Sequence, residues 1–225
     1  MAESDTTTVG GPSRLTVIFS EASTQHHRLQ CRKLAAAAFG PPLSEQDYLE
    51  REAYLDQQPL TQHGGWRTWC PRTTTEPAGQ VVSACKTIQR SLLVRESGTV
   101  SERKGYCIAS VVTHPEFRGR ELASALLQQH LGRWLDGPGD AFASMLYTSI
   151  GNFYHDRGWR MLPAYQLTLS FPTPGLRSPW SLAIPTTRLL EKAEISELCL
   201  RDVETRPPRG GGTHPISWIS HRIQA

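Results

Sequence analysis

The stretch VVTHPEFRGRELASALL, residues 111–127, joins the two kinds of local structure that decide the fold. β-Branched residues stop at His114, and leucines then recur at helical spacing. The short connection between them holds Arg118, Gly119 and Arg120. Glycine lets an anion approach the backbone closely, a helix N-terminus attracts negative charge, and arginine adds charge-assisted hydrogen bonds. The connection is therefore either a phosphate-binding turn or an ordinary strand-to-helix turn.

Sequence patterns on both sides of this stretch alternate between strands and helices. The segment 106–113 predicts a strand, and leucines on one face predict a helix over 122–135. Polar residues at 95–105 predict a loop. An α/β fold, with one mixed sheet flanked by helices, accommodates this order. Further strands are predicted at 14–19, 64–70, 81–94, 141–149 and 159–171, and further helices at 29–39, 44–55 and 150–158.

Composition divides the chain into three parts. Residues 1–13 are polar and predict a disordered tail, and residues 14–172 hold the alternating elements of one domain. Residues 173–225 predict a C-terminal extension, with a proline-rich linker, an amphipathic helix at 189–204 and a loop. Trp218, near the end of that extension, marks a candidate contact for a homodimer.

Composition also argues against several classes of protein. The formal net charge is +3 and the arginines are scattered, which argues against a nucleic-acid partner. No segment approaches the roughly 18 apolar residues that span a bilayer, so we expect no membrane partner. The five cysteines are odd in number and form no CxxC pair, so we expect no metal site and no disulfide framework. Free cysteines fit a reducing compartment, and we expect the cytoplasm.

A second motif lies downstream of the turn, at FYHDRGW (153–159), where Tyr154 stands four residues before Gly158. A strand, the turn PEFRGR, a leucine-rich helix, another strand and FYxxxGW follow in an order that resembles the GNAT acetyltransferase superfamily over residues 14–172. The segments LYTSIGNFYHDRGW and MLPAYQLTLSFP are similar to the fungal lysine N-acetyltransferase-like branch. Compared with that branch, the chain looks shortened at its C-terminus.

This resemblance implies a GNAT-like mixed sheet and acetyl-CoA as co-substrate. The turn would hold the pyrophosphate, and the backbone of the preceding strand would pair with the pantetheine arm. Two positions depart from the family pattern Gln/Arg-x-x-Gly-x-Gly/Ala, because Glu116 replaces Gln/Arg and Glu121 replaces the small residue. A carboxylate at Glu121 would compete with a phosphate for the helix N–H groups. The cofactor-binding residues implied are Val111, Val112, Thr113, Arg118, Gly119, Arg120, Leu122 and Ala123.

The resemblance also implies catalytic roles. Tyr154 would protonate the departing thiolate; the alternative is a half-buried tyrosine that anchors a short helix. His114 is a candidate general base, because imidazole titrates near neutral pH; the alternative is a loop histidine before proline. Tyr48 and Glu52, on the helix predicted at 44–55, are candidates for binding the amine substrate; the alternative for Glu52 is a solvated helix face.

Three functions remain open at this point. The first is transfer of an acetyl group from acetyl-CoA to a primary amine of a small molecule, such as lysine or a related metabolite. The second is a different small-molecule reaction of fungal secondary metabolism on the same scaffold, without acetyl-CoA, which Glu116 and Glu121 would favour. The third is a non-catalytic GNAT-fold binding protein, because a fold by itself does not fix a function.

Overall fold

The computed structural model describes residues 5–10, 14–74 and 79–161, with single positions between 188 and 201. Contacts divide the chain into two compact units, one of Met1–Leu162 with Trp218–Ala225 and one of Pro163–Ser217. Every strand and helix that positions the candidate site belongs to the first unit. In the described part of the chain, no helix is long and apolar enough to cross a lipid bilayer.

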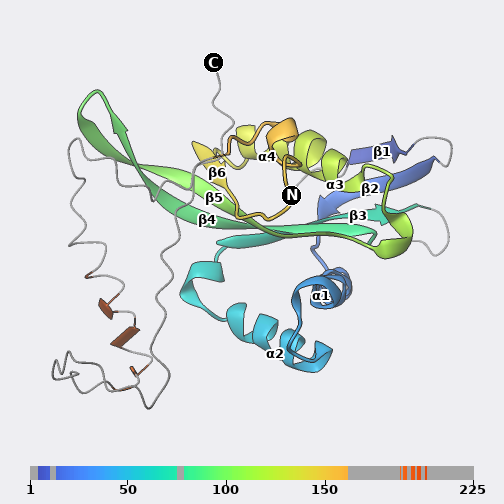
Figure 1. Ribbon diagram of the computed structural model, residues 1–225, viewed down its shortest axis with the longest axis horizontal. Helices are drawn as coiled ribbons and strands as arrows, with labels where there is room; N and C mark the ends of the chain where they lie inside the picture. The colour runs from blue at the N-terminus through green and yellow to red at the C-terminus, as the bar shows by residue number, and fades with distance from the viewer. Residues whose placement is uncertain are drawn as a thin grey trace, which may run out of the picture. The chain divides into compact units, whose positions relative to one another are not determined.

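One mixed sheet of six strands forms the centre of the first unit (Figure 1). In spatial order the strands are β1 (Asp5–Val9), β2 (Leu15–Glu21), β3 (Trp66–Thr73), β4 (Ser83–Glu96), β5 (Thr99–Thr113) and β6 (Ala143–Met145). Neighbouring strands are antiparallel except β5 and β6, which run parallel. The α/β fold with a mixed sheet, predicted from the sequence, is confirmed.

Helices cover both faces of this sheet (Figure 1). On one face, which we call the α1–α2 face, lie α1 (Gln25–Phe39) and α2 (Glu45–Leu55). On the other, the α3–α4 face, lies one long helix made of α3 (Leu122–Ala125), the π-helical segment η3 (Leu126–Leu131) and α4 (Gly132–Asp136). Three 3₁₀ turns complete the elements: η1 (Pro59–Thr61), η2 (Pro115–Phe117) and η4 (His155–Arg157).

Side-chain caps fix where α1 and α2 begin. The Thr24 hydroxyl accepts a hydrogen bond from the backbone N–H of His27 at 3.1 Å. The Ser44 hydroxyl accepts one from the backbone N–H of Asp47, also at 3.1 Å. Such caps satisfy donors that a helix leaves unpaired in its first turn. The start of α2 at Ser44, predicted from its serine and the acid three residues on, is confirmed.

The α3–α4 face carries the main hydrophobic core. The long helix contributes four almost fully buried leucines: Leu122, Leu126, Leu127 and Leu131. They recur on one side of the helix because helical residues three and four apart share a face. Trp69 of β3 is fully buried in the same core, with its ring centroid 4.7 Å from that of Trp134 and 5.5 Å from that of His130. This packing fixes the long helix over the centre of the sheet.

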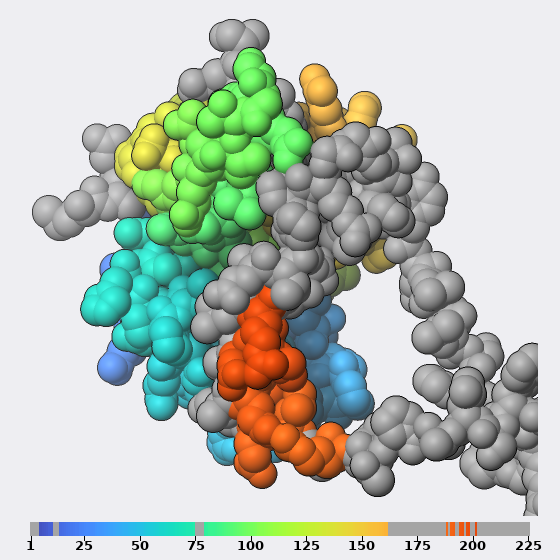
Figure 2. Space-filling model, turned by 90° about the vertical axis from the view of Figure 1, so that its left-hand side faces the viewer, coloured from blue at the N-terminus to red at the C-terminus, as the bar shows by residue number. Residues whose placement is uncertain are grey.

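Residues 95–105, predicted as a loop, instead belong to a long hairpin of β4 and β5, whose side chains form the green surface of Figure 2. Ser97 and Gly98 have φ of 48° and 84°, as in the two-residue turns whose twist suits a hairpin. Leu93, near this turn, is 66% exposed. The prediction is wrong because both faces of this hairpin meet solvent, so its strands need no alternation of apolar and polar residues. Their polar sequence is equally typical of a loop.

Other predictions differ in extent. Asp5–Val9 forms β1, which pairs with β2, so the predicted disordered tail at 1–13 is wrong for these residues. The strand predicted at 141–149 covers only Ala143–Met145, and the helix predicted at 150–158 is a single turn at His155–Arg157. The strand predicted at 159–171 and the helix at 189–204 lie largely outside the described residues.

Replacing Leu126 by alanine should lower the free energy of unfolding by about 2–5 kcal/mol, because a fully buried leucine leaves a cavity behind. Urea denaturation followed by circular dichroism measures this loss. The exposed Leu93 is the matched control, and Leu93→Ala should change the free energy of unfolding by less than about 0.5 kcal/mol. Equal losses in the two variants would contradict the packing of the long helix on the sheet.

Candidate active site

The turn between β5 and α3 is built from one 3₁₀ turn and two residues with positive φ. β5 ends at Thr113, and η2 follows, capped by the His114 ring, whose Nδ1 accepts from the backbone N–H of Glu116 at 3.4 Å. Gly119 has φ of +75°, a conformation that favours glycine. A Cβ atom placed on Gly119 would meet no other atom within 4 Å, so the backbone there faces open space. The turn thus has the room that a phosphate needs.

Glu121 occupies the last position before the helix in a left-handed conformation, with φ of 58° and ψ of 18°. This is where the superfamily pattern has a small residue, and the conformation explains that preference, because a side chain there is strained. The Glu121 side chain is exposed and makes no capping hydrogen bond to the helix. The competition for helix N–H groups that the sequence suggested is therefore absent from this arrangement.

Three guanidinium groups lie in the turn or contact the first residues of the long helix. Arg118 donates from Nε to the Thr113 carbonyl at 3.3 Å, and the Arg120 guanidinium lies 5.6 Å from the centre of the Phe117 ring. Arg157, from η4, donates to the Ser124 hydroxyl from Nε at 2.9 Å and from Nη2 at 2.6 Å. The sequence analysis named Arg118 and Arg120 as cofactor-binding residues but did not name Arg157, although Arg157 lies inside the FYxxxGW motif.

β5 carries a bulge close to this turn. Ala84 pairs with Val112 and Lys86 with Ala109, so that Cys85 of β4 faces two residues of β5, Ser110 and Val111. Ser110 has φ of 53°, and such an extra residue leaves part of the ladder unpaired. On its other side β5 pairs with β6 only over Gly105–Cys107 among the described residues. Beyond Cys107, no described strand pairs with this side of β5, although the Val112 carbonyl accepts from the Ser83 hydroxyl and the Thr113 carbonyl from Arg118.

Tyr154, which precedes η4, lies on the α3–α4 face in the main core and is 8% exposed. Its ring packs edge-on against Phe153 and Trp159, with centroids 5.0 and 6.2 Å away. Burial, reinforced by the Cys85 thiol and opposed by Arg157, raises the pKa of Tyr154 to about 12. No described residue hydrogen bonds its hydroxyl. The hydroxyl therefore stays protonated at neutral pH, is a weaker acid than that of an ordinary tyrosine, and has no acceptor among the described residues.

The other predicted residues separate into two places. His114 belongs to the turn, where its ring packs edge-on against Phe117 at 5.6 Å. Leu122 is almost fully buried, so that it can offer a ligand only its backbone, and Ala123 follows it in the first turn of α3. Tyr48 and Glu52 lie on the opposite α1–α2 face. The structure therefore gathers the predicted cofactor residues but sets the predicted amine-binding residues across the sheet.

A buried ion pair defines the α1–α2 side of the site. Glu52 is 3% exposed and pairs with Lys86 of β4, whose Nζ lies 4.2 Å from the centre of the Trp66 ring. Burial lowers the pKa of Lys86, and the Glu52 carboxylate opposes this shift. Burial and the Glu52 charge raise the pKa of Tyr48, which is 1% exposed. Lys86 was missed by the sequence reasoning, since a lysine within a strand carries no signal of burial.

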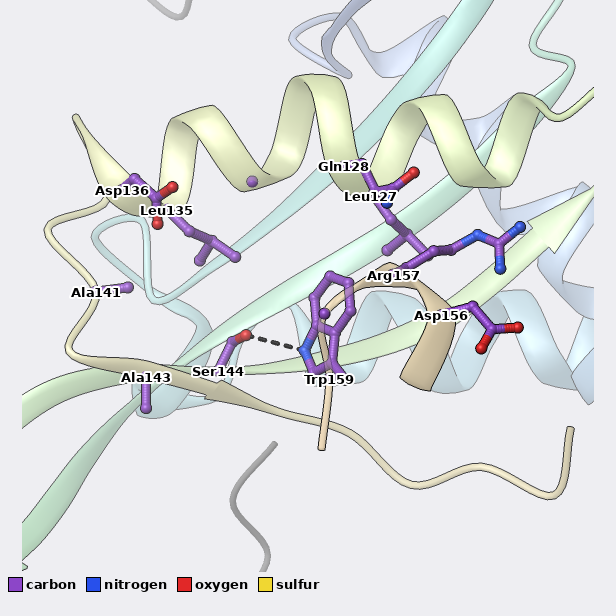
Figure 3. A pocket seen from close by; sticks show the side chains of 12 residues that line it. Leu127, Gln128, Leu135, Asp136, Ala141, Ala143, Ser144, Asp156, Arg157 and Trp159 are labelled. Carbon is purple, nitrogen blue, oxygen red and sulfur yellow. Dashed lines mark hydrogen bonds between the residues drawn. The ribbon is translucent and has the colours of Figure 1, made fainter. Parts of the chain in front are cut away.

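A cavity of about 240 Å³ lies between the long helix, β6 and η4 (Figure 3). Arg157 and Trp159 line it, and the Trp159 indole N–H donates to the Ser144 hydroxyl at 3.1 Å. None of the turn residues from His114 to Glu121 lines this cavity. Across the described residues, no group of three or more His, Cys, Asp or Glu side chains could hold a metal ion.

Comparison with known proteins gives one family match, to a domain described as "Acetyltransferase (GNAT) domain", over residues 22–162. No curated protein sequence matches the chain. Solved structures that resemble it include a glucosamine-6-phosphate N-acetyltransferase from Arabidopsis thaliana, with 14% identity, a TM-score of 0.47, and 68% of this chain and 97% of that one covered. Another is a GNAT family acetyltransferase from Brucella melitensis in complex with acetyl-CoA, with 19% identity, a TM-score of 0.45, and coverage of 64% and 82%.

Replacing Glu121 by glycine should raise the free energy of unfolding by about 1 kcal/mol, because glycine adopts the left-handed conformation without strain. Glu116 offers a control in the same turn, since it is also exposed but has no positive φ. Glu116→Gly should leave stability unchanged or lower it. Urea denaturation of both variants measures the difference, and a loss of stability in Glu121→Gly would contradict the observed backbone conformation.

Proposed function

The chain belongs to the acetyltransferase (GNAT) domain family, and on this basis we propose that it transfers the acetyl group of acetyl-CoA to a primary amine of a small molecule. The observation that carries the proposal is the β5–α3 turn, where Gly119 leaves open space beside arginines at the start of a helix. Lysine or a related metabolite is the acceptor we favour, because residues 146–159 and 161–172 resemble the fungal lysine branch.

The residues of the turn fit a pyrophosphate. A helix start presents unpaired N–H groups and roughly half a positive charge, and Arg118 and Arg120 add full charges beside it. Arg157 extends the same positive region and, through Ser124, ties η4 to the helix. The backbone of β5 at Val111, beside the bulge, would pair with the amide groups of the pantetheine arm, and the same role at Val112 and Thr113 stays a prediction. Bound there, acetyl-CoA supplies an activated thioester.

The chemistry then needs a proton for the departing sulfur. A thiolate has an ordinary pKa near 8.5, so that a tyrosine gives up its proton only as the thiolate forms in a dry site. The Tyr154 hydroxyl is the candidate donor, because no described residue accepts its proton. Burial raises its pKa, so the transfer needs a thiolate whose pKa the same dry site raises as well. The attacking amine must lose a proton as well; His114 at the turn stays the candidate base, and Glu52 on the α1–α2 face stays a candidate for binding the amine.

A second function, a small-molecule reaction without acetyl-CoA, is favoured by one observation. Glu116 and Glu121 both stand in the turn as exposed carboxylates, and each opposes the approach of a phosphate. A homodimer through the C-terminal segment stays a prediction, since Trp218 lies outside the described residues. A cytoplasmic location stays a prediction as well. Binding of acetyl-CoA separates the two enzymatic functions.

Calorimetric titration with acetyl-CoA at low salt should show binding with a micromolar Kd, because guanidinium–phosphate attraction is strongest when salt does not screen it. Arg118→Ala combined with Arg120→Ala should weaken binding by at least a hundredfold. Arg103→Ala combined with Arg133→Ala removes the same charge from exposed positions outside the turn and should leave the Kd unchanged. If the unaltered chain gives no heat and no shift in Tm, the turn does not bind acetyl-CoA, and the result supports the second function, a reaction without acetyl-CoA.

Replacing Tyr154 by phenylalanine should lower kcat by about 10²-fold or more and leave the Kd for acetyl-CoA unchanged, because only the transferable proton is lost. Steady-state assays of coenzyme A release with a responsive amine measure kcat. Tyr106 is the control, since it is 4% exposed and its hydroxyl donates to the Gly139 carbonyl at 2.9 Å. Tyr106→Phe should cost stability but keep kcat. A Tyr154→Phe enzyme with full kcat would exclude Tyr154 as the acid.

A further inference from the structure

A second cavity, of about 340 Å³, lies between α1, the segment after α2 and the adjoining ends of β2 and β3. We call it the Arg28 cavity. Its lining includes three arginines and two acids: Arg28, Arg32, Arg67, Glu21 and Asp56. Three guanidinium groups against two carboxylates leave one formal positive charge. A polar cavity with this balance can hold a negatively charged group.

Arg28 provides the uncompensated charge. Asp56 pairs with Arg32, and Glu21 pairs with Arg67 at 2.7 Å from Oε2 to Nη1. Arg28 instead donates to two neutral backbone carbonyls, from Nε to Ala22 at 2.9 Å and from Nη2 to Ser23 at 3.3 Å. These two bonds hold the guanidinium in place but do not neutralise it. A guanidinium has five N–H donors, so that others stay free for a ligand.

Neighbouring groups support a ligand in this position. Arg32 uses only Nη2 toward Asp56 among the described residues, and its other donors are free for an anion. Gly64 allows Arg67 to come close, since a methyl group on Gly64 would lie 3.1 Å from Arg67 Nη2. His63 lines the cavity with φ of 54°, a strained conformation of the kind that collects at binding sites.

The Arg28 cavity adjoins the α1–α2 side of the candidate active site. Trp66 lines the cavity, and its ring lies 4.2 Å below the Nζ of Lys86, the partner of Glu52. Thr68, another lining residue, pairs with Lys86, which in turn pairs with Ala109 beside the bulge of β5. Two strand spacings separate the cavity from that bulge, roughly 10 Å. A small molecule can span this distance.

We propose that the Arg28 cavity binds a carboxylate or phosphate group of the acceptor, which would make the acceptor an amine that also carries an anionic group. The link to an amine rests on the proposed acetyltransferase function, whereas anion binding rests on the cavity alone. Charge also orients the molecule. A free amine is cationic at neutral pH, so the arginines repel it and leave it at the far end, toward β5.

Titration of the full chain with succinate and with inorganic phosphate, at constant ionic strength, tests the proposal. We expect one of them to bind and to raise the Tm, and Arg28→Gln to weaken that binding at least tenfold. Lys33→Gln is the matched control, because it removes the same charge from a position of the same helix that does not line the cavity, and it should leave the Kd unchanged. Preference for succinate would identify a carboxylated acceptor, and preference for phosphate a phosphorylated one.

Binding of neither ion, or equal binding by Arg28→Gln and the unaltered chain, would overturn the proposal. Titration of the same samples with acetyl-CoA keeps this failure apart from failure of the proposed function. If neither anion binds the unaltered chain while acetyl-CoA binds it and Arg28→Gln with the same Kd, the proposed anion site is contradicted and the proposed acetyl transfer is not. If the anions bind but acetyl-CoA does not, the anion site in the Arg28 cavity is supported and the proposed acetyl transfer is contradicted.

Discussion

The packing of one long helix against the sheet is the constraint on which the site depends. Leu126, Leu127 and Leu131 are fully buried, and together with Trp69 they hold the helix over the central strands. Because only η2 and a short turn separate β5 from this helix, the same packing places the helix start, with its unpaired N–H groups, near the end of β5. Arg157 then fastens η4 to Ser124 of the helix, and Tyr154 enters the core beside it.

The residues predicted to bind the cofactor and those predicted to bind the amine lie on opposite faces of the sheet. The turn, the arginines beside it and Tyr154 belong to the α3–α4 face, whereas Glu52, Lys86 and Tyr48 belong to the α1–α2 face. The bulge at Ser110 lies in the strand between these two groups, next to Lys86 in the ladder. A distorted strand can present backbone groups that a regular ladder would pair.

How far the sequence predicted these features depends on whether the signal was local. The turn at Gly119, the cap of α2 and the helix with its leucines depend on neighbours in the chain, and they were found. The start of α1 was not, because it lies at Gln25 with Thr24 as its cap and not at residue 29. The bulge at Ser110 was not, because it arises from the register of β5 against β4. Burial of Lys86 was missed for a similar reason, because it depends on a distant segment: α2 supplies the Glu52 carboxylate that pairs with Lys86 and packs over it. The β4–β5 hairpin was missed because solvated strands lack apolar alternation.

Net charge says little about partners when charges pair locally. The chain carries only +3 overall, yet two regions of the fold concentrate unpaired positive charge: the start of the long helix, and the Arg28 cavity. In the first, arginines come from the turn and from η4 and meet a helix end. In the second, two acids neutralise two of three arginines and leave Arg28 bound to carbonyls. Both regions suit anions because of how their charged side chains are arranged and not because the chain is strongly basic. A net charge of +3 is therefore enough for a chain that would bind one cofactor phosphate and one acceptor anion.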